Sequence, residues 1–356
     1  MSDAPDPLAP LLLGRDFRIP RADLNGKTVL ITGGTGSFGR AFVQAVLDEF
    51  EPRKLIVFSR DELKQYEMAQ VFPAERHPAM RWFIGDVRDQ ARLETAMRGV
   101  DYVVHAAALK HVPIAEYNPF ECIKTNVLGA ENVVNAAIRS GVKRVVALST
   151  DKAANPVNLY GASKLASDKI FCAAEAMVGG DGPRFSVVRY GNVVGTRGSV
   201  VPFFQRLVAE GARELPITDP RMTRFWITLA QGVNFVLSSL ALMQGGEIFV
   251  PKIPTLRTVD LARLIAPHLP QRTVGIRPGE KLHEVMIPED DARAALELDD
   301  RYVILPVYDQ ARRAAAYRAM GGRPLPEGFC YSSDRNSEHL DARSLQALVA
   351  GRLSAA

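Results

Sequence analysis

A glycine-rich loop near the start of the chain constrains the fold more than any other feature of the sequence. The segment 32–39 reads TGGTGSFG and carries a glycine at every third position, Gly33, Gly36 and Gly39. It lies between an apolar, strand-like segment and a segment with helical periodicity. Glycine suits a tight turn, the close approach of a pyrophosphate to backbone N–H groups, and close packing of helix on strand. This context predicts a dinucleotide-binding turn that opens a βαβ unit.

Short apolar segments alternate with helix-length segments over the first half of the chain. The strand-like segments are rich in β-branched residues and occupy residues 27–32, 54–59, 81–85, 101–105, 144–149 and 185–189. Segments with apolar residues at i, i+3 and i+4 occupy residues 38–50, 93–97, 126–139 and 159–177. Continuous apolar strands are typical of a parallel sheet that is covered on both faces. The alternation predicts an α/β fold with a Rossmann-type, doubly wound parallel sheet.

Three regions are expected along the chain. Residues 1–25 are rich in proline and predict an N-terminal arm that either packs on the domain or stays loose. Residues 26–190 hold the alternating pattern and predict a Rossmann domain that binds the cofactor and carries the catalytic residues. Beyond it the alternation fades into helical segments and one strand, at residues 201–210, 228–243, 247–250 and 259–267. Residues 191–356 therefore predict mainly a smaller C-terminal substrate-binding lobe, with some segments returning to the Rossmann domain.

Composition argues against several other classes of protein. The 44 basic and 40 acidic residues leave a net charge of +4, and the basic residues are scattered, so neither nucleic acid nor a membrane surface is an expected partner. No stretch reaches the roughly 20 apolar residues of a membrane helix, and the N-terminus does not resemble a signal peptide. The cysteines lack a paired spacing and predict buried free thiols in a reducing compartment, so a cytoplasmic location is expected; they are Cys122, Cys172 and Cys330. The six histidines show no metal-ligand spacing, and no metal is expected.

The residues after the second predicted strand bear on the choice of cofactor. An NAD site usually offers an acidic residue to the ribose 2′-hydroxyl, and Asp61 or Glu62 could serve. Arg60 and Lys64 could instead neutralise a 2′-phosphate, which favours NADP. The expected cofactor site before residue 110 comprises Gly33, Thr35, Gly36, Ser37, Phe38, Gly39, Ser59, Arg60, Asp61, Glu62, Leu63, Lys64, Asp86, Val87, Ala106, Ala107 and Ala108.

Tyr160 and Lys164 form a YxxxK pair on a segment predicted to be helical. At i and i+4 the two side chains share one face of that helix. A neighbouring ammonium group favours the phenolate, so Tyr160 could take a proton from a substrate alcohol as hydride leaves its carbon. Lys164 could also hold ribose hydroxyls. The pair predicts a reductase-type active centre.

Asp151 and Lys152 follow directly after the fifth predicted strand, which ends near Ser149 and Thr150. The carboxyl ends of strands in such sheets face the ligand crevice. A plain reductase needs only a hydroxyl there, so a carboxyl group and an amine predict additional proton transfers. An acid and a base beside a ketone are what elimination requires, because oxidation of a sugar at C4 makes its C5 proton acidic and lets the C6 hydroxyl leave.

Several long motifs together resemble a known family. They are TGGTGSFG, VFSRDELKQYEM, HAAALKHVPIAEYNPFECIKTNVLGAENVV, STDKAANPVNLYGASKLASDKIF, RYGNVVGTRGSVVPFF and IRPGEKLHEVMI. The chain resembles, from about Lys27 to its C-terminal region, the UDP-N-acetylglucosamine 4,6-dehydratase (inverting) family, which begins pseudaminic acid synthesis for flagellin glycosylation. This family lies within the extended short-chain dehydrogenase/reductase superfamily.

The resemblance implies a reaction and a set of roles. NADP+ oxidises C4 with help from Tyr160, Lys152 removes the C5 proton, Asp151 helps water leave C6, and hydride returns to C6. Thr150 and Lys164 complete the implied catalytic set. The implied substrate contacts are Lys110, Lys152, Asn192, Thr218, Arg277 and Glu280, and the nicotinamide side is lined by Val193, Val194, Gly195, Thr196 and Arg197. Tyr160 and Lys164 also contact the cofactor. The resemblance further implies a homo-oligomer, either a dimer or a hexamer.

Two other enzymes and one non-enzyme remain as alternatives. The segment 12–27 resembles the linker of long, membrane-attached relatives, which include retaining dehydratases with Met in place of Tyr160. Tyr160 therefore favours the inverting class, while the linker favours the retaining class. A nucleotide-sugar C4 epimerase would use the same cofactor and the same Tyr–Lys pair. A non-enzymatic NADP-binding sensor would have no need for the four residues Asp151, Lys152, Tyr160 and Lys164.

Overall fold

A large, mostly parallel sheet forms the centre of the computed structural model, which describes residues 15–179, 182–196 and 199–340. Within these residues the sheet has ten strands in the order β16-β14-β15-β10-β6-β5-β4-β1-β2-β3. Their bounds are β1 (Thr28–Thr32), β2 (Lys54–Ser59), β3 (Met80–Ile84), β4 (Tyr102–His105), β5 (Arg144–Thr150), β6 (Arg184–Tyr190), β10 (Ile248–Pro251), β14 (Ala295–Glu297), β15 (Arg301–Ile304) and β16 (Arg323–Pro324). The strands from β3 to β10 pair in parallel, which confirms the predicted fold class.

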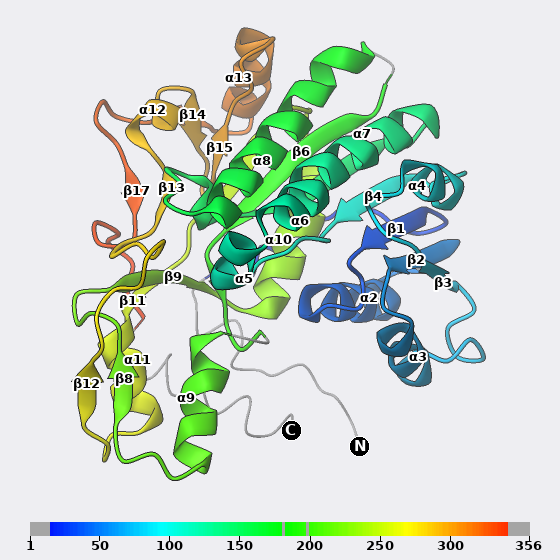
Figure 1. Ribbon diagram of the computed structural model, residues 1–356. Helices are drawn as coiled ribbons and strands as arrows, with labels where there is room; N and C mark the ends of the chain where they lie inside the picture. The colour runs from blue at the N-terminus through cyan, green and yellow to red at the C-terminus, as the bar shows by residue number, and fades with distance from the viewer. Residues whose placement is uncertain (1–14, 180–181, 197–198, 341–356) are drawn as a thin grey trace.

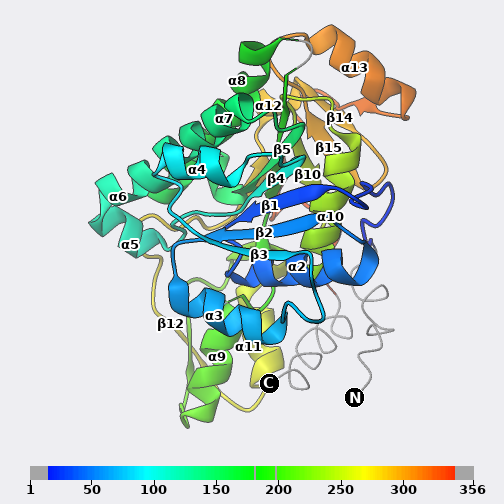
Figure 2. The ribbon, with the colours of Figure 1, turned by 90° about the vertical axis from the view of Figure 1, so that its right-hand side faces the viewer.

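Helices cover both faces of this sheet. Figures 1 and 2 show α4 (Gln90–Ala96), α7 (Gly129–Arg139) and α8 (Leu159–Val178) on one face. The other face carries α2 (Ser37–Glu49), α3 (Glu62–Val71) and α10 (Leu229–Leu242). The central strands are buried because they lie between these layers, and Val29, Val103, Val145 and Val187 have no exposed surface.

One predicted helix is divided in the structure. The segment expected to be a single helix at residues 126–139 begins with the π-helix η1 (Lys124–Leu128) before α7. Asn126 supplies a reason, because its buried amide accepts a hydrogen bond from Leu109 N (2.8 Å) and donates one to Leu109 O (2.9 Å). The wider turn thereby joins the helix to the loop after β4. The other predicted elements recur within three residues of their expected ends.

The chain beyond residue 190 contributes strands both to the central sheet and to smaller sheets. β10, β14, β15 and β16 extend the central sheet, whereas smaller sheets form below and to the left of it in Figure 1. The smaller sheets pair β7 (Asn192–Val193) and β11 (Thr255–Arg257) with β9 (Thr223–Ile227), β8 (Leu215–Ile217) with β12 (Gln271–Thr273), and β13 (Val285–Ile287) with β17 (Tyr331–Ser332). Helices of this part are α9 (Val200–Ala209), α11 (Thr258–Ile265), α12 (Glu289–Ala292) and α13 (Gln310–Ala319). β13 also packs against η2 (Asp151–Ala153), which places the second half of the chain beside the end of β5.

The described part of the N-terminal arm packs on α10. The ring of Phe17 lies 5.0 Å from the ring of Phe235, centre to centre, and is buried. Gln231 donates a hydrogen bond to Arg15 O (2.6 Å), and Ala22 N donates one to Leu237 O (3.3 Å). Of the two outcomes expected for the arm, packing therefore holds for residues 15–25, while the Leu11–Leu13 patch lies outside the described residues.

The described residues also bear on cysteines, membranes and metals. The three cysteines are free thiols, but burial is complete for Cys122 and partial for Cys172 and Cys330, whose side chains lie nearer the surface than predicted. No helix in the described part of the chain has the length and apolarity needed to cross a membrane. Nor do the described residues bring together three or more acidic, histidine or cysteine side chains in a possible metal site.

Candidate active site

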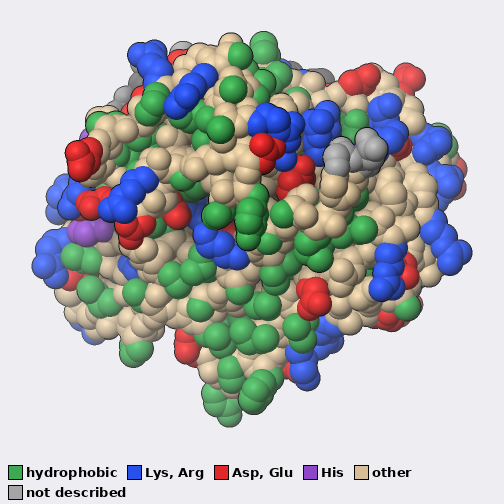
Figure 3. Space-filling view, turned by 90° about the horizontal axis from the view of Figure 1, so that it is seen from above, with side chains coloured by type: hydrophobic (Ala, Val, Ile, Leu, Met, Phe, Trp, Pro, Cys, Tyr) green, Lys and Arg blue, Asp and Glu red, His purple; other side chains and the backbone are tan. Residues whose placement is uncertain are grey.

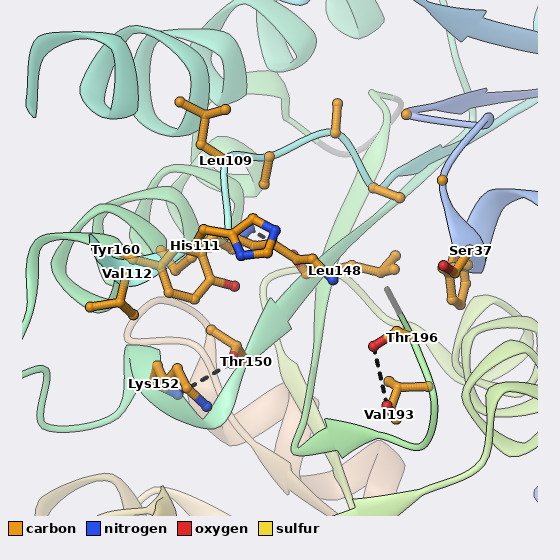
Figure 4. Close-up of a pocket in the computed structure, with 18 of the residues that line it drawn as sticks. Ser37, Leu109, His111, Val112, Leu148, Thr150, Lys152, Tyr160, Val193 and Thr196 are labelled. Atoms are coloured by element: carbon orange, nitrogen blue, oxygen red, sulfur yellow. Dashed lines mark hydrogen bonds between the residues drawn. The ribbon is translucent and has the colours of Figure 1, made fainter. Parts of the chain in front are cut away.

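A cleft of about 960 Å³ lies where the central sheet meets the smaller sheets. The carboxyl ends of β1, β4, β5 and β6 open into it, as expected for a doubly wound sheet. Figure 4 shows Ser37 at one end of the cleft and Tyr160, Thr150 and Lys152 at the other. The cleft therefore joins the glycine-rich loop to the YxxxK helix in a single site.

The glycine-rich loop has the shape that a pyrophosphate requires. Gly33 has φ +66°, and a Cβ there would lie 2.8 Å from Ala107 N. A Cβ at Gly39 would lie 2.2 Å from Gly34 O, so the helix could not approach the strand. α2 begins at Ser37 without a side chain capping its N-terminus, which leaves backbone N–H groups for an anion. These residues fit a dinucleotide.

One part of the cleft carries the acidic and basic residues that could select between NAD and NADP. Arg60, Asp61 and Lys64 all line the cleft. The Asp61 carboxylate caps α3 by accepting from Lys64 N (3.0 Å), and it pairs with Lys64 Nζ (2.6 Å). Arg60 Nη1 lies 3.6 Å from Asp86 Oδ2. The Asp61 carboxylate, which could serve NAD, is thus already bound by Lys64 in the first turn of α3. Arg60 and Lys64 both lie close to this carboxylate.

The catalytic end is assembled from β5, η2 and the start of α8. Asn158 caps α8 by accepting from Gly161 N (2.7 Å) and donates to Gly279 O (2.7 Å), which ties the helix start to the second half of the chain. Tyr160 is nearly buried, with its hydroxyl turned into the cleft in Figure 4. Lys164 lies one turn later and donates to Leu148 O (2.7 Å). The predicted pair therefore shares one helix face at the floor of the cleft.

Comparison with known proteins shows the family to which the chain belongs. A family model described as "Polysaccharide biosynthesis protein" matches residues 29–306. A UDP-N-acetylglucosamine 4,6-dehydratase (inverting) of Campylobacter jejuni subsp. jejuni is 58% identical over 329 residues, which cover 91% of this chain and 98% of that relative. The chain belongs to this family of dehydratases. The resemblance predicted from the motifs is thereby confirmed, as is membership of the extended short-chain dehydrogenase/reductase superfamily.

Two further proteins are similar to this chain, one in sequence and one in both sequence and structure. A UDP-glucose 4-epimerase of Rickettsia canadensis is 40% identical over 330 residues, covering 91% of this chain and 95% of the relative. The solved structure of Pen from Bacillus thuringiensis is 35% identical, with a TM-score of 0.82, and the match covers 93% of this chain and 99% of that one. A dehydratase and an epimerase are thus both close in sequence, and the dehydratase is the closer of these two.

The end of the cleft near Tyr160 carries a buried cluster of charges. Lys152 Nζ lies 3.1 Å from Asp151 Oδ1 and 3.4 Å from Glu284 Oε1. Asp151 has no exposed surface, and burial raises the pKa of its carboxyl, with the charge of Glu284 adding to the rise. Burial also opposes the ammonium of Lys152, but the two carboxylates outweigh it and raise the pKa of Lys152. Each of the two groups therefore loses its proton at a higher pH than the same group in water.

Tyr160 and Lys164 respond to the same burial in opposite directions. Burial raises the pKa of Tyr160 to about 12, although the positive charge of Lys152 works against the rise. Burial lowers the pKa of Lys164, although the charge of Asp168 works against the decrease. The phenol is therefore the stable form of Tyr160 before ligands bind, and Lys152 is the charge that favours its ionisation.

The structure brings most of the predicted site residues to the cleft, though not all of them. Glu62, Leu63, Asp151, Val194, Gly195 and Thr218 are not among the lining residues, and Arg197 lies outside the described residues. Leu63 points outward from the first turn of α3, and Asp151 lies behind Lys152. The remaining predicted site residues line the cleft.

Sequence reasoning missed several lining residues. Arg224, Lys281 and Glu284 come from β9 and from the segment before β13, far along the chain from Lys152. No spacing links them to the YxxxK pair, although Lys281 and Glu284 lie within the quoted motif IRPGEKLHEVMI. Arg40, Leu109, Thr125, Asn158 and Tyr190 were missed as well.

Proposed function

We propose that the chain is an NADP-dependent UDP-N-acetylglucosamine 4,6-dehydratase that inverts C5 and forms UDP-2-acetamido-2,6-dideoxy-β-L-arabino-hex-4-ulose. One observation carries the proposal: Tyr160 and the Asp151–Lys152 pair meet at one end of a cleft whose other end is the glycine-rich loop. Its family membership supports the same reaction class. An active centre of this kind places an alcohol-oxidising group and an acid–base pair beside the same sugar.

The proposed oxidation depends on Tyr160. A nicotinamide dinucleotide held by Gly33–Gly39 and by Arg60 and Lys64 would supply a hydride acceptor for C4 and later a hydride donor for C6. Tyr160 would take the proton of the C4 hydroxyl. The nearby positive charge of Lys152 stabilises the phenolate that accepts this proton.

The proposed elimination depends on Lys152 and Asp151. Lys152 lines the cleft and would take the C5 proton, so that the electrons of the C5–H bond form a double bond as the C6–O bond breaks. When hydride then adds to C6, Lys152 would return a proton to C5, which completes the keto sugar. Burial raises the pKa of the Asp151 carboxyl group. This group would therefore supply the proton that lets the C6 hydroxyl leave as water. Because Asp151 has no exposed surface, this proton would pass through Thr150 Oγ1 (2.9 Å) or Lys152 Nζ (3.1 Å), which both line the cleft.

The proposed nucleotide end of the substrate lies near Arg277. Arg277 and Glu280 line the cleft on the segment before β13, and Arg277 Nε lies 3.7 Å from Glu280 Oε1. A guanidinium group can bind diphosphate oxygens in a bidentate fork. Lys110 and Asn192 also line the cleft and would contact the sugar.

Cofactor selectivity can be tested with the double variant Arg60→Ala, Lys64→Ala. The proposal expects the affinity for NADP to fall roughly 10- to 100-fold, because hydrogen bonds to a charged phosphate contribute about 1.5–3 kcal/mol. The affinity for NAD should change less than about 3-fold. Titration calorimetry with each dinucleotide measures the difference, and Arg81→Ala, which removes an exposed arginine outside the cleft lining, is the control. Equal losses for both dinucleotides would contradict the choice of NADP.

The reaction itself can be tested in deuterated water. Purified protein is incubated with UDP-N-acetylglucosamine without added reductant, and the sugar is followed by proton NMR. The proposal expects a 4-keto-6-deoxy sugar with deuterium at C5, whose ring coupling constants show inversion. Couplings for retained configuration would favour the retaining class, and UDP-N-acetylgalactosamine would identify an epimerase. No change in the sugar at any NADP concentration would leave the sensor hypothesis.

A further inference from the structure

The charge cluster at the end of β5 contains a carboxylate that the proposed chemistry does not use. Glu284 is 2% exposed and yet is one of the residues that line the cleft. Its Oε1 lies 3.4 Å from Lys152 Nζ and 3.8 Å from Arg224 Nε, and its Oε2 lies 3.7 Å from Lys281 Nζ. Its Oε2 is buried and accepts no hydrogen bond from the described residues. A carboxylate in this position faces three cations and one neighbouring acid.

The surroundings of Glu284 hold it rigidly. Its backbone exchanges hydrogen bonds with Ser333, from N to Ser333 Oγ (2.9 Å) and from Ser333 N to its carbonyl (2.8 Å). The Arg224 guanidinium is fixed by three backbone carbonyls, those of Thr223, Lys281 and Leu282. Lys281 donates to Ala154 O (2.6 Å), on the residue that follows η2. These hydrogen bonds therefore fix the position of the Glu284 carboxylate beside Lys152.

We propose that Glu284 is a positioning residue for the elimination step, whose carboxylate holds the Lys152 amine at the cleft surface while Asp151 lies buried behind it. The inference rests on the proposed function, in which Lys152 is the base and Asp151 the acid. Lys152 bridges two carboxylates, so neither Asp151 nor Glu284 alone determines where its amine lies. Without Glu284 the amine would have only Asp151 as an anionic partner, which would draw it away from the sugar.

The charge of Glu284 also affects both proton-transfer groups in one direction. Burial opposes the ionised form of Glu284, but Lys152, Arg224 and Lys281 outweigh it and lower the pKa of Glu284, so its charge is present at neutral pH. This charge raises the pKa of Asp151 and of Lys152. The groups that face the cluster are Asp151 and Lys152 from η2, Tyr160 from α8, Arg224 from β9, and Lys281. Removing the charge should lower the pKa of both Asp151 and Lys152.

The variant Glu284→Gln keeps the shape of the side chain and removes its charge. Turnover needs Lys152 without its proton and Asp151 with its proton, so both limbs of the pH profile of kcat should move toward acid, by about one pH unit, since one nearby charge shifts a pKa by about that amount or more. At the wild-type optimum, kcat should fall about 10- to 100-fold, while KM should change less than about 3-fold. Glu284→Asp, which keeps the charge one methylene further away, should move the profile less.

Glu247→Gln is a matched control. Glu247 is also a fully buried carboxylate, which accepts from Ser186 Oγ (2.6 Å) and Gln244 N (2.9 Å), but it lies outside the cleft lining. Glu247→Gln shows how much the removal of a buried charge affects folding. Its pH profile of kcat should be the same as that of the wild type. Glu284→Gln with an unmoved pH profile, or with a loss of kcat that the control reproduces, overturns the proposal. If Glu284→Gln does not fold, Glu284→Ala removes the same charge, and an unmoved pH profile in that variant overturns the proposal instead.

A second readout separates this inference from the proposed function. Lys152 is labelled with acetic anhydride over a range of pH and the modified peptide is quantified by mass spectrometry, which needs no turnover. In Glu284→Gln the labelling of Lys152 should begin at lower pH than in the wild type, by about one pH unit. A wild-type protein that forms no keto sugar would disprove the proposed function alone. Identical labelling curves for the two proteins would disprove the role of Glu284 alone.

Discussion

Replacing Lys152 with methionine should lower kcat for the keto sugar about 1000-fold, within the range of roughly 10²- to 10⁴-fold that a positioned acid or base contributes. Methionine keeps much of the side-chain volume but cannot take the C5 proton. Oxidation at C4 keeps Tyr160 but loses the Lys152 charge that favours its phenolate, so this step should become slower while removal of the C5 proton is lost altogether. The reaction should therefore stop after oxidation. The expected signature is reduced cofactor, seen by its near-ultraviolet absorbance, together with loss of deuterium incorporation at C5.

The control for this variant is Lys252→Met. Lys252 is also largely buried and pairs with Glu297 (2.8 Å), but it lies outside the cleft lining. Thermal unfolding of both variants shows how much of any loss comes from removing a buried ammonium group. A Lys152→Met protein that stays folded and keeps more than about a tenth of wild-type turnover would show that another residue is the base.

Replacing Tyr160 with phenylalanine should lower kcat by roughly 10²- to 10⁴-fold, and it should do so at the earlier step. The ring packs with Val112, Ala115 and Leu159, and phenylalanine preserves these contacts. Without the hydroxyl the proposed acceptor of the C4 proton is gone. Neither reduced cofactor nor deuterium at C5 should therefore appear, which distinguishes this variant from Lys152→Met.

Tyr317→Phe is the matched control for the second variant. Tyr317 has no exposed surface, its hydroxyl donates to Leu242 O (3.4 Å), and it lies outside the cleft lining. Its turnover should stay within about 2-fold of the wild type. Accumulation of reduced cofactor in Tyr160→Phe would mean that oxidation at C4 proceeds without this phenol, and the role of Tyr160 would have to be assigned elsewhere.

The surface agrees with a small-molecule substrate. On the face seen in Figure 3, basic and acidic side chains are interspersed, so that face presents no broad region of one sign. Nucleic-acid binding requires such a region. The exposed basic residues Arg60 and Arg277 lie instead at the cleft, where they would meet individual phosphate groups.

The parts of the site that depend on local patterns were predictable from the sequence. The glycine spacing at 33, 36 and 39 needs only a strand before it and a helix after it, and the apolar runs predict both. Tyr160 and Lys164 share a face because helical periodicity places i and i+4 together. Lys152 was placed at the cleft because residues that follow a parallel strand lie at the ligand edge of the sheet.

Contacts between distant segments were decided by the tertiary structure. Glu284 meets Lys152 because β13 packs against η2, and Arg224 and Lys281 in turn pair with Glu284. No periodicity relates these segments. The same packing buries Asp151 and leaves Lys152 at the surface of the cleft, although the two are neighbours in sequence. The return of β10, β14 and β15 to the central sheet is likewise set by pairing across the chain. Short-range patterns therefore determined the fold class and the main candidate catalytic residues, while long-range packing determined the charges around them.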